Sequence, residues 1–277
     1  MLYDLHVHTT ASDGFYSPPE VLQKADRLGL LGIAITDHDS VDGLTTARDY
    51  LNHSTLKVNF IPGIELNTEW CGEEIHILGY FIDYENSHLL TRLESLKNAR
   101  LDRAKKILSK LKSMGINLAF SEVQRLAPGN LIGRPHIARA MMEKGYVFSI
   151  KEAFDKYISR GRPAYVARYK FVCTEAIDII KKAGGIAVLA HPGLIRSKDV
   201  LDFVLQQDID GIEVFYPEHT EEQVKRLTDL CAEKNLFITG GSDFHGQSGD
   251  RNRDRLGCCG INAAEMLKIF HYSNKKV

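Results

Sequence analysis

The chain has 277 residues, of which 44% are hydrophobic and 26% charged, an ordinary composition for a globular protein with a sizeable core. Its longest apolar runs, such as residues 186–190, are strand-sized, so we expect no membrane-spanning segment. The N-terminus has no apolar signal core, which favours a cytoplasmic protein. Five cysteines without a Cys-x-x-Cys pair exclude a disulfide framework and a thiolate zinc knuckle as the organising feature.

Charge is unevenly spread along the chain although the formal net charge is −1. Residues 91–170 contain 18 Lys and Arg against 6 Asp and Glu. This basic segment favours contact with an anionic substrate, whereas the acidic remainder favours binding of cations.

Short apolar strands alternate with helical segments along the first third of the chain. Ser17, Pro18 and Glu20 have the spacing of a capping box at a helix start. The predicted elements are a strand at 2–8, a helix from 17 to about 29, a strand at 32–36, a helix at 41–52, and a hairpin of strands 58–69 and 74–82.

The hydrophobic period changes to that of helices from about residue 87, and strand–helix alternation resumes after residue 170. The predicted later elements are helices at 87–115, 121–127, 134–144, 150–159 and 174–183, a strand at 186–190, a helix near 200, a strand at 211–215, a helix at 220–234 and a strand at 236–239. This order predicts an α/β fold with a parallel sheet or barrel. We expect residues 1–86 and 171–277 to form the barrel domain and residues 87–170 to form an inserted helical subdomain.

Histidines and carboxylates follow the predicted strands one after another. Because the carboxyl ends of parallel barrel strands meet at one mouth, these side chains should converge there. The candidates, in chain order, are His6, His8, Asp13, His38, Glu65, His76, His191, Asp243 and His245.

Local spacing supports metal binding by this set. Residues i and i+2 of an extended chain point the same way, so His6 and His8 can hold one ion. Asp243 and His245 repeat the arrangement, and a carboxylate such as Glu65 can bridge two ions. Imidazole and carboxylate ligands without thiolates suit Zn²⁺, Mn²⁺ or Fe²⁺. We expect Asp37 to orient a ligand histidine through its other ring nitrogen.

Together these motifs resemble the polymerase-and-histidinol-phosphatase (PHP) family, and the likeness spans the chain. The motifs are His6-x-His8 with Asp13, Thr36-Asp37-His38, Glu65, His76, His191-Pro192 and Ser242-Asp243-x-His245. The resemblance implies a distorted (β/α)₇ barrel with two or three divalent metal ions, Mn²⁺ before Zn²⁺ or Fe²⁺, at its mouth. It implies three ligand sets: His6, His8, Glu65 and Asp243; Glu65, His76 and His191; Asp13, His38 and His245.

The chain resembles one branch of the family, the nucleotide phosphatases, through two motifs. They are Gly133-Arg134-Pro135-His136 within the helical insertion and Gly240-Gly241-Ser242-Asp243-Phe244-His245-Gly246. Relatives in that branch remove the 3′-phosphate of nucleoside 3′,5′-bisphosphates, and some trim short RNA from its 5′ end. The resemblance implies that Arg134 and His136 bind the substrate's phosphate, for which the planar fork of an arginine is suited.

The predicted activity is therefore hydrolysis of a nucleotide phosphomonoester by metal-activated water. Asp243, Glu65, His191 and Arg134 are the expected catalytic residues. The expected partner is a small anionic phosphorylated substrate, a nucleotide or a short oligonucleotide, with no membrane and no obligate protein partner.

Four alternatives stay open from the sequence. They are a histidinol-phosphate phosphatase, a 5′–3′ exonuclease on short oligonucleotides, a non-catalytic module with structural metals, and a barrel hydrolase of the amidohydrolase type. The insertion at Arg134 and the Phe244 between Asp243 and His245 oppose the first. Structural zinc sites are usually closed and rich in thiolate, which opposes the third. No lysine ends a predicted strand, which opposes the fourth.

Overall fold

The computed structural model describes residues 2–127, 132–167, 169–246 and 254–276. The chain divides into two compact units. The first, here the barrel unit, comprises Met1–Leu90 and Lys170–Val277, and the second, here the helical unit, comprises Thr91–Tyr169. All the strands found in the described residues belong to the barrel unit.

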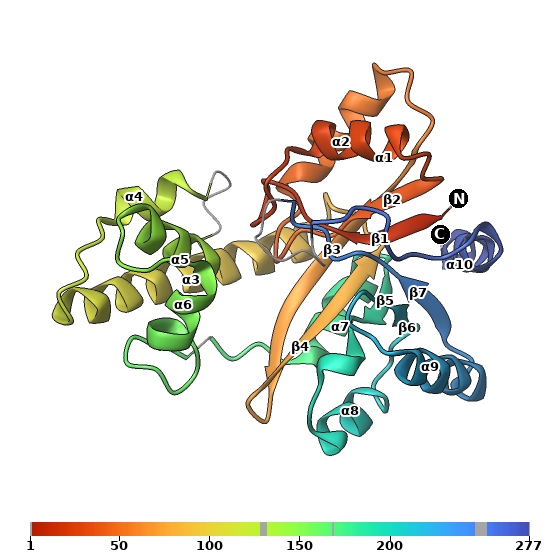
Figure 1. Ribbon diagram of the computed structural model, residues 1–277. Coiled ribbons are helices and arrows are strands. Elements are labelled where there is room, and N and C mark those ends of the chain that lie inside the picture. The colour runs from red at the N-terminus through yellow and green to blue at the C-terminus, as the bar shows by residue number, and fades with distance from the viewer. Residues whose placement is uncertain (1, 128–131, 168, 247–253, 277) are drawn as a thin grey trace. The chain divides into compact units, whose positions relative to one another are not determined.

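The strands of the barrel unit form one sheet in which they lie in chain order (Figure 1). Strand β4 is antiparallel to both of its neighbours, whereas the other neighbouring pairs are parallel. The bounds are β1 Tyr3–Val7, β2 Gly32–Ile35, β3 Asn59–Trp70, β4 Glu73–Tyr80, β5 Ile186–Leu189, β6 Gly211–Phe215 and β7 Phe237–Gly240.

Hydrogen bonds between the end of β1 and the segment that follows β7 nearly close this sheet into a barrel. His8 donates its backbone N–H to the carbonyl of Phe244 at 2.9 Å, and Phe244 donates to the carbonyl of His6 at 3.3 Å. These bonds join the end of β1 to the segment that follows β7. The predicted fold class, an α/β fold with a distorted (β/α)₇ barrel, is confirmed.

Helices cover the outside of the barrel, and most begin where the sequence predicts. The capping box of α1 is confirmed, since Ser17 donates its backbone N–H to Glu20 Oε2 at 2.8 Å. A helix near the C-terminus is absent from the sequence prediction. The helices of this unit are α1 Pro18–Arg27, α2 Asp42–Asn52, α7 Cys173–Lys182, the 3₁₀ turn Pro192–Leu194, α8 Lys198–Val204, α9 Glu221–Lys234 and α10 Ala263–Lys276.

The unpredicted helix α10 contributes to the core of the barrel. Met266 and Ile269 pack in one buried cluster with strand residues such as Leu5, Ile186 and Val188. Strands β2 and β5 are buried along their whole length, as expected for strands that have the barrel interior on one side and helices on the other.

The helical unit is built around its own apolar core. Helix α3 begins in the barrel unit and continues into this one, where its Ile107, Leu108 and Leu111 are buried on one face. The predicted helix at 150–159 is a short α-helix followed by a π-helical turn. The bounds are α3 Ser87–Ser113, α4 Phe120–Arg125, α5 Arg134–Glu143, α6 Ile150–Ala153 and the π-helix Phe154–Ile158.

Candidate metal centre

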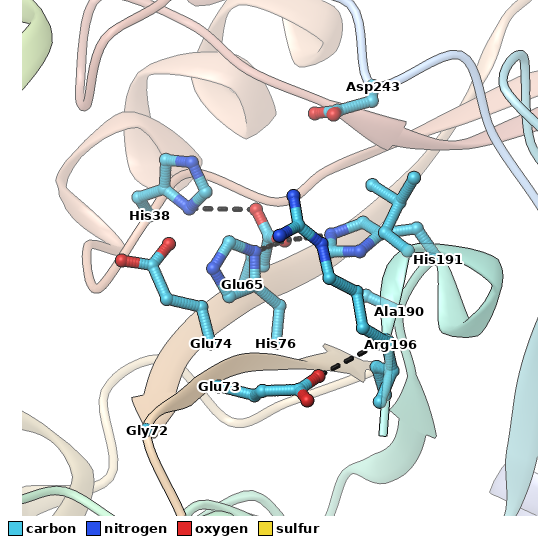
Figure 2. Close-up of a pocket in the computed structure, with 12 residues that line it drawn as sticks. His38, Glu65, Gly72, Glu73, Glu74, His76, Ala190, His191, Arg196 and Asp243 are labelled. Atoms are coloured by element: carbon cyan, nitrogen blue, oxygen red, sulfur yellow. Dashed lines mark hydrogen bonds and ion pairs between the residues drawn. The ribbon is translucent and has the colours of Figure 1, made fainter. Parts of the chain in front are cut away.

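Glu65, in the middle of β3, is the residue around which the candidate ligands gather. Its Oε1 lies 2.7 Å from His76 Nδ1 and 3.3 Å from His191 Nε2. Its Oε2 lies 2.7 Å from His38 Nδ1. Figure 2 shows these three imidazoles around the carboxylate, each carried by a different part of the barrel. One carboxylate thus offers its two oxygens to two different groups of histidines, as a bridging ligand would.

A second carboxylate joins the pair of histidines at the end of β1. Asp243 Oδ1 lies 3.4 Å from His6 Nε2 and 3.1 Å from His8 Nε2. Glu65 Oε2 lies 3.3 Å and 3.2 Å from the same two nitrogens. The four side chains are fully or almost fully buried, and their donor atoms face one another.

Asp13 and His245 form the remaining part of the cluster. His245 Nε2 lies 3.3 Å from Asp13 Oδ1. Donor atoms of these two residues, His8 and His38 all lie within 4.8 Å of one another. The expected set of Asp13, His38 and His245 therefore comes together, with His8 beside it. His38 also belongs to a group with Glu65 and His76, so the three sets share members.

The spacing of these donors matches that of ligands around a metal ion. With bonds of about 2.1 Å to nitrogen and oxygen, neighbouring ligands lie about 3.0 Å apart in an octahedron and about 3.4 Å apart in a tetrahedron. The buried atoms His6 Nε2, His8 Nε2 and Glu65 Oε2 make no hydrogen bond to any described residue. Leaving a buried polar group unsatisfied costs about 1–3 kcal/mol. A divalent cation would satisfy all three, so the donor set fits a metal.

A buried glutamate of β6, which the sequence reading missed, supports two of these residues. Glu213 Oε1 lies 2.9 Å from His6 Nδ1, and its Oε2 accepts the backbone N–H of His191 at 2.8 Å. A proton on His6 Nδ1 leaves the lone pair of Nε2 available to a metal. The signal available in the sequence was Glu213 inside an apolar strand, where an acidic side chain needs a partner.

The role expected for Asp37 is wrong. Its carboxylate accepts the backbone N–H of Thr9 at 2.8 Å, the Thr9 hydroxyl at 2.7 Å and the Ser12 hydroxyl at 2.5 Å. Asp37 thus holds the loop between His8 and Asp13 instead of a histidine ring. Thr9 and Ser12 are buried, so their hydroxyls need a hydrogen-bond acceptor, and the carboxylate of Asp37 provides one.

Tyr216 and a backbone carbonyl orient two further ligand candidates. The Tyr216 hydroxyl donates to Asp243 Oδ2 at 3.0 Å, which leaves Oδ1 directed at the histidines. His245 Nδ1 lies 2.8 Å from the carbonyl oxygen of Asp243, a contact that directs Nε2 toward Asp13. Tyr216 is a second functional residue that sequence reasoning missed, because a tyrosine after a strand is ordinarily only a packing residue.

Strained backbone occurs at the cluster. His191 and Asp243 have φ of 28° and 51°, and Asp39, next to His38, has φ of 49°. Residues other than glycine rarely adopt this left-handed region, and such strain costs about 1–3 kcal/mol each. The strain lies where candidate ligands leave the strand ends.

Electrostatics keeps the central carboxylate charged. Burial alone would raise the pKa of Glu65, but His38, His6 and His76 outweigh burial and hold its pKa well below the ordinary value. Burial opposes a charge on His6, yet Glu213, Glu65 and Asp243 raise its pKa well above the ordinary value. The surroundings that attract a proton to His6 would equally attract a divalent cation.

A pocket of about 340 Å³ opens beside the cluster in the barrel unit. Its wall is formed by the β3–β4 turn, by the segment after β5 and by five residues of the cluster, which are His38, Glu65, His76, His191 and Asp243 (Figure 2). The pocket is large enough for a phosphate with part of a nucleoside.

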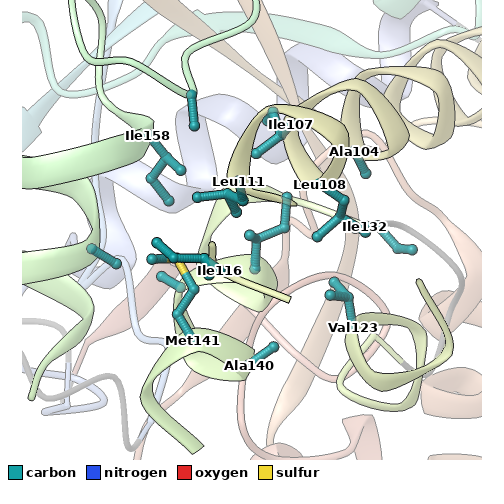
Figure 3. Packing of buried hydrophobic residues seen from close by; sticks show 14 of the residues in the cluster. Ala104, Ile107, Leu108, Leu111, Ile116, Val123, Ile132, Ala140, Met141 and Ile158 are labelled. Atoms are coloured by element: carbon teal, nitrogen blue, oxygen red, sulfur yellow. The ribbon is translucent and has the colours of Figure 1, made fainter. Parts of the chain in front are cut away.

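Arg134 and His136 lie in the helical unit, at the start of α5. The helix is anchored by Ala140 and Met141 in the core of that unit (Figure 3). The guanidinium of Arg134 lies over the ring of Phe154, with 5.5 Å between its carbon and the ring centroid. His136 is 3% exposed, and its Nδ1 accepts the backbone N–H of Gly133 at 3.0 Å. Phosphate binding by this pair stays a prediction.

Comparison with known proteins identifies the family. The PHP domain matches residues 4–238 of the chain. The chain belongs to the PHP family. Its PHP domain has the α/β barrel expected of the family, and the chain is a hydrolase of phosphate esters. Membership implies divalent metal ions, which agrees with the fit of the donor set.

Several relatives cover nearly the whole chain. The 5′-3′ exoribonuclease Rnm of Escherichia coli is 36% identical over 250 residues, which are 88% of this chain and 85% of the relative. The 3′,5′-nucleoside bisphosphate phosphatase of Chromobacterium violaceum is 32% identical over 258 residues, which are 91% and 89% of the two chains.

A solved structure from Bifidobacterium adolescentis, described as a metal-dependent phosphoesterase, has a TM-score of 0.88 at 30% identity, covering 97% of this chain and 95% of that one.

Among the described residues of this PHP-family chain, no helix has both the length and the apolar character needed to cross a membrane.

Proposed function

We propose that the chain is a nucleotide phosphoesterase that removes the 3′-phosphate of nucleoside 3′,5′-bisphosphates. The observation that carries the proposal is the Glu65-centred cluster, in which five histidines and a second carboxylate turn their donor atoms toward one another around a bridging residue. Similarity over nine-tenths of the chain to a 3′,5′-nucleoside bisphosphate phosphatase supports the substrate.

Nine residues would hold two or three divalent ions, with Mn²⁺ favoured over Zn²⁺ or Fe²⁺. They are His6, His8, Asp13, His38, Glu65, His76, His191, Asp243 and His245. When bound, such ions polarise a phosphate and lower the pKa of water. The protein's own part is to fix the ligands before substrate arrives. Glu213 and Tyr216 do this through His6 and Asp243.

We also propose that Arg134 and His136 bind the substrate's phosphate. The basic composition of residues 91–170 supports this assignment. Arg134→Ala should chiefly weaken the handling of substrate, and an unchanged kcat/KM would remove the role.

A second candidate activity is 5′–3′ exonucleolysis of short oligonucleotides. Three exoribonucleases are 34–36% identical to this chain, which favours it. The two activities share their chemistry, because both cleave between phosphorus and the 3′ oxygen of a nucleotide that carries a 5′-phosphate. An oligonucleotide differs only in having a further nucleotide on the scissile phosphate.

Release of products from four substrates side by side, with added Mn²⁺, tests the proposal. The substrates are adenosine 3′,5′-bisphosphate, AMP, histidinol phosphate and a short 5′-phosphorylated oligonucleotide. Chelator-sensitive turnover of the bisphosphate supports the proposal. Turnover of histidinol phosphate alone would replace it with the histidinol phosphatase alternative, and turnover of the oligonucleotide alone would leave the second candidate.

Variants of the cluster test the site. Glu65→Gln and Asp243→Asn should each remove most activity while leaving the circular dichroism spectrum unchanged. The exposed Glu233 of α9 provides a matched control, since Glu233→Gln makes the same chemical change outside the cluster. Near-normal turnover by both cluster variants would refute the assignment.

A further inference from the structure

An arginine that the motifs do not include lines the pocket beside the candidate metal centre. Arg196 follows the 3₁₀ turn after β5, and its side chain extends into the pocket, toward the group formed by Glu65 and His191 (Figure 2). Its guanidinium makes no hydrogen bond or ion pair with any residue in the described part of the chain. A cationic fork facing a pocket without an anionic partner can receive an anionic ligand.

The base of this side chain is held in place by a carboxylate from the β3–β4 hairpin. Glu73 accepts the backbone N–H of Arg196 with Oε2 and that of Ser197 with Oε1, each at 2.9 Å. These two charge-assisted bonds tie the segment after β5 to the hairpin and set the point from which the guanidinium extends. Glu73 is thus a positioning residue for Arg196.

The other charged side chains at this end of the pocket are acidic. Glu73 and Glu74 both line it, whereas Arg196 is the only Lys or Arg among the described residues that do. A 3′,5′-bisphosphate brings two anionic groups, and the candidate metal centre can neutralise only the one that it hydrolyses. A second phosphate at this end of the pocket needs a cation beside it, because Glu73 and Glu74 would otherwise repel it.

We propose that Arg196, positioned by Glu73, binds the 5′-phosphate of the substrate, the phosphate that is not hydrolysed. The inference rests on the proposed function and deepens it, since both candidate substrates carry a 5′-phosphate. A pocket of about 340 Å³ accommodates a phosphate at each end of a ribose. Arg196 would make the enzyme select nucleotides phosphorylated at the 5′ position.

Paired substrates that differ only at the 5′ position test this role. With Mn²⁺ present, Arg196→Ala should lower kcat/KM about 10–100-fold for adenosine 3′,5′-bisphosphate, the loss expected for a bidentate contact with an anion. For adenosine 3′-monophosphate the change should be less than about threefold. Arg196→Lys, which keeps the charge but not the fork, should lie between.

Lys198 provides the matched control on the same segment. It is exposed, pairs with Asp202 and does not line the pocket, so Lys198→Ala should change neither substrate's kcat/KM. Glu73→Ala should raise KM for the bisphosphate more than it lowers kcat, and Glu73→Gln, which keeps a carbonyl acceptor, should restore part of the loss.

Binding of adenosine 5′-monophosphate, measured by calorimetry, tests Arg196 independently of turnover. Arg196→Ala should weaken this binding by the same factor as kcat/KM for the bisphosphate. Equal losses on both substrates would place Arg196 at the hydrolysed phosphate and overturn the inference, as would unchanged binding of the 5′-monophosphate. Failure of the wild-type protein to hydrolyse the bisphosphate would overturn the proposed function, while the calorimetric comparison would still decide the role of Arg196.

Discussion

Replacing Glu213 by glutamine should weaken metal binding without unfolding the barrel. The glutamate serves two donors at once, His6 Nδ1 at 2.9 Å and the backbone N–H of His191 at 2.8 Å. Glutamine has a single oxygen, so its NH₂ group must face one of these two N–H donors. One hydrogen bond is lost, and the other loses its ionic character.

The magnitude follows from these two bonds. An unmet hydrogen bond at a buried donor costs about 1–3 kcal/mol, and the loss of charge weakens the surviving bond by roughly half. Because His6 and His191 are then held less well, about 1.4–2.7 kcal/mol of this cost is lost from the free energy of metal binding. This corresponds to an affinity about 10–100-fold weaker. Activity at saturating metal should recover to within about threefold of the wild type.

Calorimetric titration of the metal-free protein with Mn²⁺ measures the effect directly. Glu233→Gln serves as the control, because Glu233 is exposed on α9 and makes no contact with the cluster. A folded Glu213→Gln protein with a dissociation constant within twofold of the wild type would refute the reasoning. So would an equal loss of affinity in the Glu233→Gln control.

Three further predictions concern the same architecture. Chelation should abolish phosphate release and lower Tm by several degrees, because an ion at 100 times its dissociation constant stabilises the folded protein by about 2.7 kcal/mol. A Tm that does not change when Mn²⁺ is added would contradict the fit of the donor set. Tyr216→Phe should reduce kcat/KM about 10-fold, because Asp243 Oδ2 loses its hydrogen bond, and the circular dichroism spectrum should stay unchanged. The control is Tyr50→Phe on the outer helix α2, and an equal effect of that change would argue against a local cause. Leu111→Ala should lower the free energy of unfolding of the helical unit by about 2–5 kcal/mol, measured with urea, whereas Leu90→Ala at an exposed position should lower it far less. Similar urea midpoints for the two variants would contradict the buried core.

The strand–helix pattern could be predicted because each element has a strong local signal. The capping box of Ser17, Pro18 and Glu20 predicts the start of α1, and the short apolar run of β5 has the length of a strand. Helix α10 was missed although a local signal precedes it. Asn262 is followed three residues later by Glu265, and Asn262 Oδ1 accepts the backbone N–H groups of Ala264 and Glu265 at 2.9 and 3.0 Å. The apolar face of α10, in contrast, is defined by the barrel core that it completes.

The ligand candidates could be predicted from residue type and position after strands, whereas their supporting residues could not. His6 and Asp243 are conspicuous by residue type, but Glu213 and Tyr216 gain their roles from neighbours 207 and 27 positions away. For Asp37, in contrast, its position in the sequence suggested the wrong role. It stands beside His38 in the sequence, yet the hydroxyls of Thr9 and Ser12 bind its carboxylate instead.

The left-handed backbone at Asp39, His191 and Asp243 has a consequence for engineering of this protein. Glycine would adopt these dihedral angles without steric cost, so a search for variants that are thermostable without bound metal should repeatedly favour glycine at these three positions. Two of the three replacements would delete a candidate metal ligand. Selection for heat resistance of the metal-free protein alone would therefore favour a more stable but inactive barrel. Screens for stabilised variants of this protein need to require turnover at the same time.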